Sequence, residues 1–118
     1  MGLPKADVND VPEDDLVAFI ATSIGSIWAL ELLLLLRRDP GRSWDAESLV
    51  RELRSSPTII SEALGRLQRV GLTAQDRSGT CRYDAASPRL DRLASELEKV
   101  YAARPTTVIN AIVAARTV

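Results

Sequence analysis

Residues 55–72 read SSPTIISEALGRLQRVGL, and this stretch decides how the rest of the chain is interpreted. Ser56 is a typical N-cap and Pro57 fits the first helical position, so we predict a helix over 57–70. Its apolar residues recur at helical spacing and form the buried stripe Ile60, Ala63, Leu64 and Leu67. Its other face keeps an apolar Ile59 and an acidic Glu62 beside its arginines.

Three helices are predicted before this stretch. The first, 12–24, opens with Pro12 followed by acidic residues, which suit the positive end of a helix dipole. The second, 27–38, is apolar on almost every face. It contains IWALELLLLL, which is too short to span a bilayer and predicts a buried core helix. The third, 46–54, follows the candidate N-cap Asp45.

A β-hairpin and a C-terminal helical region are predicted after it. Residues 72–75 and 80–83 have the composition of two short strands, and Gly79 supplies the positive φ of the turn that joins them. Residues 88–116 carry apolar stripes at helical spacing. Pro105 interrupts this region, and the pattern leaves open whether it bends one helix or separates two.

Composition excludes several classes of function. The chain of 118 residues suggests one domain, and it holds no histidine and one cysteine. Zinc sites of the Cys/His type and histidine-based catalysis are therefore excluded. With no phosphate-binding loop and no clustered catalytic carboxylates, we expect no enzyme, no metal and no cofactor. The lone cysteine and an acidic start without an apolar run predict a cytoplasmic protein, with residues 1–10 as a flexible N-terminus.

The order of predicted elements over 27–84 resembles the winged helix-turn-helix of bacterial transcription regulators, in the broad MarR/ArsR-like group. The likeness is carried by SWDAESLVRELRSSPTIISEALGRLQRVGLTAQ (43–75) and by SGTCRYD (78–84). It implies a mainly α fold with a small β-hairpin wing, arranged as a single winged-helix domain over 11–118. The segments 12–24 and 88–116 are then flanking helices, of the kind that pair two copies.

The resemblance implies a dimeric DNA-binding transcription regulator. Its recognition helix, about 57–70, enters the major groove, and its wing, about 72–84, lies on the flanking backbone or minor groove. The residues expected to face double-stranded DNA are Arg51, Arg54, Ser56, Thr58, Ile59, Ser61, Glu62, Arg66, Arg69, Arg77 and Arg82. The residues expected to form the homodimer are Phe19, Leu97, Val100, Tyr101, Val108, Ile109, Ile112 and Val113.

An alternative keeps the same fold but changes the partner. The sequence pI is about 5.4, and Ile59 and Glu62 are poorly suited to a phosphate-lined surface. The winged helix would then bind a protein, such as a sigma factor or a sensor protein, with little or no DNA binding. Glu47 precedes Arg51 by four residues and Glu62 precedes Arg66 by four, so these arginines can also be ordinary helical ion pairs.

Cys81 has two interpretations. A redox sensor requires an exposed thiol with a lowered pKa, and Arg82 beside it is mildly suggestive. The simpler interpretation is a small residue in a strand.

Overall fold

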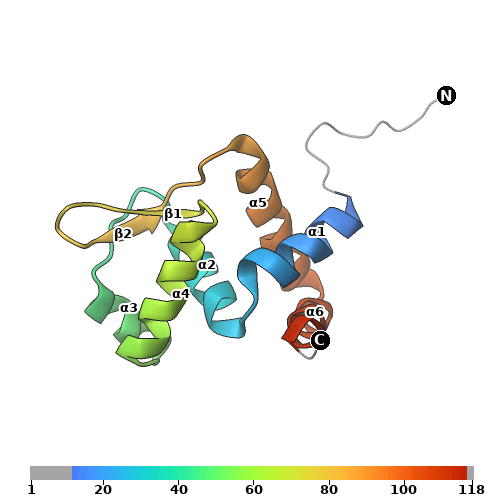
Figure 1. Ribbon diagram of the computed structural model, residues 1–118, viewed down its shortest axis with the longest axis horizontal. Helices are drawn as coiled ribbons and strands as arrows, with labels where there is room; N and C mark the ends of the chain where they lie inside the picture. Colours follow the sequence, from blue (N-terminus) through green and yellow to red (C-terminus); the bar gives the residue numbers. More distant parts are fainter. Residues whose placement is uncertain (1–11, 117–118) are drawn as a thin grey trace.

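A computed structural model describes residues 12–116, and the predicted flexible segment 1–10 lies outside them. This part of the chain forms six α-helices, one π-helical turn and a two-stranded antiparallel hairpin (Figure 1). The elements are α1 (Glu13–Phe19), η1 (Ile20–Ile24), α2 (Ile27–Arg38), α3 (Ala46–Leu53), α4 (Pro57–Arg69), β1 (Thr73–Gln75), β2 (Cys81–Tyr83), α5 (Pro88–Ala103) and α6 (Pro105–Arg116). The prediction of a mainly α fold with a small β-hairpin is confirmed.

Four helices begin at side-chain caps. The side chains of Ser26, Asp45, Ser56 and Ser87 each accept a hydrogen bond from the backbone amide three residues further on, at the starts of α2, α3, α4 and α5. A cap satisfies one of the amides that a helix leaves unpaired at its start, and is worth about 1 kcal/mol. The predicted helix starts are confirmed at these positions.

The first helix differs from the prediction in its last turn. The sequence predicts one α-helix over 12–24, but the α-helical part ends at Phe19 and the chain continues as η1. The Gly25 amide donates to the Ile20 carbonyl, five residues back, and Gly25 ends the segment in the left-handed region at φ 71°. The Thr22 hydroxyl also donates to the Ala18 carbonyl at 2.7 Å, a contact that tends to bend helices.

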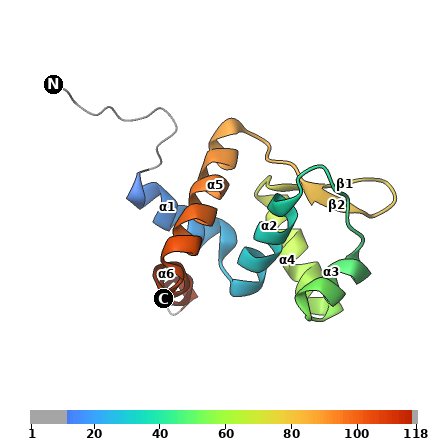
Figure 2. The same ribbon diagram turned by 180° about the vertical axis from the view of Figure 1, so that it is seen from behind.

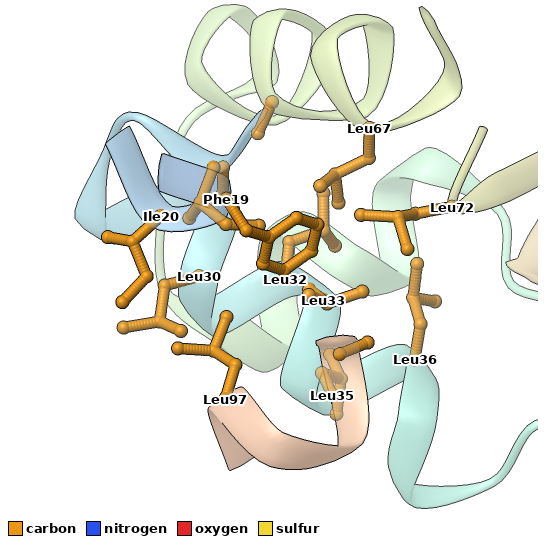
Figure 3. Close-up of a cluster of buried hydrophobic side chains, with 14 of the residues drawn as sticks. Phe19, Ile20, Leu30, Leu32, Leu33, Leu35, Leu36, Leu67, Leu72 and Leu97 are labelled. Carbon is orange, nitrogen blue, oxygen red and sulfur yellow. The ribbon is translucent and has the colours of Figure 1, made fainter. Parts of the chain in front are cut away.

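Helix α2 lies at the centre of the core, as its apolar sequence predicts. Its buried residues are Ala29, Leu30, Leu32, Leu33, Leu35 and Leu36. Figure 3 shows these leucines together with Phe19 from α1, Leu67 from α4, Leu72 and Leu97 from α5. Within the described residues, no single helix is long and apolar enough to cross a bilayer. The segments Glu13–Ile24 and Ile27–Arg38 reach that length only together, and they meet at 103°.

The remaining elements are divided between two ends of the molecule. Figures 1 and 2, seen from opposite sides, place α3, α4 and the hairpin at one end and α1, α5 and α6 at the other. Pro105 separates two helices rather than bending one, because Arg104 leaves the helical region at φ −143° and α6 begins afresh at the proline. Helix α6 packs against both α5 and η1.

The hairpin is tied to the chain that precedes α3. Residues 73–75 pair with 81–83 in antiparallel register. Trp44 adds a bridge to Cys81, with both backbone N–H to carbonyl bonds at 2.8 Å. The Trp44 side chain is buried, and the Arg42 guanidinium lies 3.6 Å from the centroid of its ring. The chain at Trp44 thus forms a partial third strand beside the hairpin.

Arg37, at the end of α2, joins the hairpin to α5. Its guanidinium donates to Glu98 at 3.1 and 3.3 Å and to Asp91 at 3.3 Å, and it lies 5.0 Å from the centroid of the Tyr83 ring. The Tyr83 hydroxyl donates to Asp91 at 2.6 Å. Burial of the phenol, together with this hydrogen bond, raises the pKa of Tyr83 to about 12.

Removing the Arg37 side chain should destabilise the fold. Hydrogen bonds to charged groups contribute roughly 1.5–3 kcal/mol, and both carboxylates remain partly solvated without their partner, so we expect Arg37→Ala to cost about 2 kcal/mol. Urea unfolding followed by circular dichroism measures this. The neighbouring Arg38 is exposed and has no partner among residues 12–116, so Arg38→Ala is the control and should leave the unfolding midpoint unchanged. Equal effects of the two variants would contradict the assignment.

Candidate nucleic-acid interface

Helix α4 offers its outer face to solvent. Ile60, Ala63 and Leu67 point into the core, and α3 packs against the same helix. The exposed positions on the opposite side are Pro57, Thr58, Ser61, Glu62, Gln68 and Arg69. Ser56 caps the helix through its Oγ, as the sequence predicts. Pro57 and Thr58 of the first turn are exposed. A regular helix that packs on the core with one face and is exposed on the other has a shape that the major groove of DNA admits.

A shallow groove separates α4 from the hairpin. It has a volume of about 310 Å³ and is lined on the helix side by Ser61, Gly65 and Gln68 and on the hairpin side by Gln75 and Gly79. The hairpin therefore lies along one flank of α4, next to the exposed face. Figure 1 shows the turn of the hairpin extending beyond α3 and α4.

A second hollow, of about 470 Å³, lies on the opposite flank of α4, against the start of α2. Its lining residues are Ser26, Trp28, Ile59, Glu62, Ala63, Arg66 and Arg69. Ile59 is half-buried in this hollow rather than fully exposed, and it shares the wall with the half-buried Trp28. The sequence alone gives no signal for this hollow, because Trp28 and Ile59 belong to different helices and are brought together only by their packing.

Arg66 is turned away from the exposed face of α4. Its Nε donates to the Ser23 carbonyl and one Nη to the Thr22 carbonyl, both at 3.2 Å. These carbonyls lie at the end of η1, where a helix leaves acceptors unpaired and where the dipole favours a cation. The guanidinium passes closely by Gly25, where a Cβ atom would overlap it. Arg66 thus caps η1, and it is not displayed on the exposed face as the sequence suggests.

The turn of the hairpin is held by Asp76. One carboxylate oxygen accepts from the amides of Ser78 and Thr80 and from the Ser78 hydroxyl, and the other accepts from the Thr80 hydroxyl at 2.6 Å. The hydroxyl bonds to Thr80 and Ser78 lower the pKa of Asp76 to about 2, so it is ionised at neutral pH. Arg77 is exposed within this turn and has no partner among the described residues.

The other arginines predicted to face DNA differ in whether their side chains have partners within the chain. Arg54 is exposed and ends α3 in the left-handed region, at φ 54°. Arg51 is exposed and donates to the Ser48 hydroxyl, and Arg82 pairs with Asp84 at 3.4 Å. The helical ion pairs considered from the sequence, Glu47 with Arg51 and Glu62 with Arg66, are not formed among residues 12–116. The arginines on this surface alternate with the exposed acids Asp45, Glu47, Glu52 and Glu62.

Cys81 lacks the properties of a redox sensor. Its side chain is buried in β2, and burial raises the pKa of the thiol, with a smaller contribution from Asp76. A reactive cysteine requires the opposite, a lowered pKa and an exposed sulfur. Cys81 is therefore a small strand residue whose backbone pairs with Trp44.

The predicted dimer residues do not all lie on the surface. Phe19, Leu97, Val108 and Ile112 are buried inside a single chain, with exposed fractions of 4%, 0%, 0% and 1%. Helix α6 folds back onto α5 and η1 and covers these side chains within one copy. Val100, Tyr101 and Ile109 are half-buried, and Val113 is 51% exposed. The Tyr101 hydroxyl donates to Glu31 in α2 at 3.1 Å.

An apolar groove remains between α1, α5 and α6. It has a volume of about 140 Å³, and its apolar lining is Leu16, Val17, Ile20, Val100, Val108 and Ala111. Glu13, Glu96 and Arg104 line the same groove and place charges of both signs beside it. Val17 is 47% exposed. This groove lies at the opposite end of the molecule from α4 and the hairpin.

Comparison of the chain with known protein families, with curated proteins and with solved structures found no significant match.

Placing a methyl group at Gly25 should break the Arg66 cap. Alanine in the left-handed region costs roughly 1–2 kcal/mol, and its Cβ would displace the guanidinium from the two carbonyls. We therefore expect Gly25→Ala to lower the unfolding free energy by about 2 kcal/mol, measured by urea unfolding. Gly41→Ala, where a Cβ meets nothing within 4 Å, is the matched control.

A double-mutant cycle separates the cap from the backbone strain. Arg66→Ala should cost less when Gly25 is already alanine than in the native chain, because the same hydrogen bonds are then already broken. Strictly additive costs would show that Arg66 does not act through this cap.

Proposed function

We propose that this protein is a DNA-binding transcription regulator with a winged helix-turn-helix, in which α3 and α4 form the helix-turn-helix and the hairpin is the wing. The observation that carries the proposal is the open outer face of α4, braced by α3 and flanked by a hairpin whose exposed turn bears Arg77. In such modules the second helix contacts base edges with its N-terminal residues. The exposed Thr58, Ser61 and Glu62 occupy that part of α4.

The phosphate contacts come from a small set of arginines. Arg69 and Arg77 are exposed, have no partner among the described residues, and belong to α4 and to the hairpin turn. Arg51 and Arg54 add positive charge at the end of α3. Arg66 is not in this set, because its guanidinium is committed to the Thr22 and Ser23 carbonyls. The alternation with acids implies modest non-specific affinity, with a salt dependence set by the small number of phosphate contacts.

Replacing Arg69 and Arg77 should weaken DNA binding uniformly across sequences. Removal of one arginine–phosphate pair should reduce the slope of log affinity against log salt by about 1, so Arg69→Ala/Arg77→Ala should reduce it by about 2. Fluorescence anisotropy with a mixed-sequence duplex, titrated at several salt concentrations, measures the slope. Lys99→Ala removes an exposed charge from α5 and is the control. Absence of salt-dependent binding by the native chain would refute the proposed function.

The protein acts as a homodimer in this proposal, paired through the groove between α1, α5 and α6. Glu13, Glu96 and Arg104 place charges of both signs at the groove, so that a two-fold arrangement brings unlike charges of two copies together. The half-exposed Val17 supplies apolar surface for burial between the copies. Two copies paired at this end hold two α4 helices apart, as binding to two half-sites of one operator requires.

A charge within this groove should separate the copies. Val17→Asp places an unpaired carboxylate on the apolar lining, and we expect it to convert dimer to monomer in sedimentation equilibrium. Ala18→Asp adds the same charge at the next position of α1, which is exposed but does not line the groove, and should leave the dimer intact. A native chain that remains monomeric at all concentrations, or a dimer unaffected by Val17→Asp, would reject this interface.

A second candidate function is a protein-binding module, favoured by the hollow beside α4. Its half-buried Trp28 and Ile59 form an apolar wall next to the charged Glu62 and Arg69, a mixture typical of protein contacts. In this case Ile59→Asp would abolish capture of the partner, while DNA retention would be absent in the native chain. The salt titration above distinguishes the two candidates directly.

A further inference from the structure

Glu62 is an acidic residue on the exposed outer face of α4. It is exposed, and it forms no hydrogen bond or ion pair with any of residues 12–116. The basic residue four positions later, Arg66, is bonded to two backbone carbonyls and forms no ion pair with it. The carboxylate of Glu62 is therefore free to meet a ligand.

A free carboxylate at this place is unfavourable for non-specific DNA binding, because it adds to the repulsion from the phosphates. It becomes favourable only opposite a hydrogen-bond donor. Two bases present donors in the major groove, cytosine at N4 and adenine at N6. Adenine places the acceptor N7 next to its donor, which suits an amide but repels a carboxylate. Cytosine presents the N4 donor without an adjacent acceptor on the same base.

We propose that Glu62 is a specificity-determining residue that accepts a hydrogen bond from the N4 amino group of a cytosine in the major groove. This inference rests on the proposed function of α4 as a DNA-reading helix, and it adds the base that this position selects. It also explains why an acidic side chain is compatible with a DNA-facing helix. The Glu62 carboxylate is repelled by the phosphates of any duplex. A hydrogen bond from cytosine offsets this repulsion only at sites where the cytosine is present.

The position of Arg69 is consistent with a phosphate contact by Arg69 beside a base contact by Glu62. Its guanidinium lies over Gly65, where a Cβ atom would be 3.3 Å from one Nη, and it forms no ion pair with Glu62. Arg69 thus remains available to a phosphate while Glu62 remains available to a base. The half-buried Ile59 on the other side carries no competing donor.

The experiment compares base preferences of the full chain and its variants. Selection from a randomised duplex library defines the preferred site of the native protein, and anisotropy then measures every single base-pair change in that site. We expect one C·G pair whose replacement weakens native binding by about tenfold or more. In Glu62→Ala this preference should fall to near onefold, while affinity for unrelated duplexes stays equal or rises. Glu62→Gln should move the preference at that pair toward adenine, which an amide contacts in two places.

Glu52→Gln is the matched control. It removes the same charge from an exposed position on α3, so any general gain in affinity from reduced repulsion should appear there without a change in base preference. Unchanged preference at every position in both Glu62 variants, with native DNA binding intact, would overturn the cytosine contact and leave the proposed function standing. Absence of salt-dependent DNA binding by the native chain would overturn both.

Discussion

The burial of the α2 leucines is the interaction on which the rest of the fold depends. Helices α3 and α4, the turn η1 and strand β2 pack against α2. Helix α5 is joined to α2 by side-chain hydrogen bonds of Arg37 and Tyr101. Leu30, Leu32, Leu33 and Leu36 are fully buried, and truncation of such a side chain to alanine typically costs 2–5 kcal/mol. Because α2 is apolar on most faces, it can support two different sets of helices, one at each end of the molecule.

This central position gives each end a separate surface. At one end α4 and the hairpin expose polar and charged side chains, while at the other α1, α5 and α6 enclose an apolar groove. Polar links cross between them: Arg66 reaches from α4 to η1, Arg37 reaches from α2 to α5, and the Tyr83 hydroxyl of β2 donates to Asp91 of α5. A displacement of η1 would therefore be transmitted to α4 through the hydrogen bonds of Arg66, in addition to the packing of the leucines.

The local features of this fold were predictable from sequence, but the contacts that long side chains make with distant parts of the chain were not. Ser26, Asp45, Ser56 and Ser87 act within three residues of themselves, so their capping roles follow from local pattern alone. Arg66 meets carbonyls more than 40 residues earlier in the chain, and no periodicity signals that contact. Burial of Phe19 and Ile112 likewise depends on how α6 folds back onto the chain. An apolar stripe in the sequence is compatible with such packing within one chain and equally with packing against a second copy.

The turn of the Arg66 side chain toward η1 has a consequence for redesign of this surface. Helix α4 combines residues that hold the scaffold with residues that face outward, and Arg66 belongs to the first group although its position in the sequence suggests the second. A graft of another helix's outer surface onto this chain would therefore have to retain Arg66 together with Gly25. Thr58, Ser61, Glu62 and Arg69 could be exchanged as a set, since all four are exposed and make no side-chain hydrogen bond within the described chain.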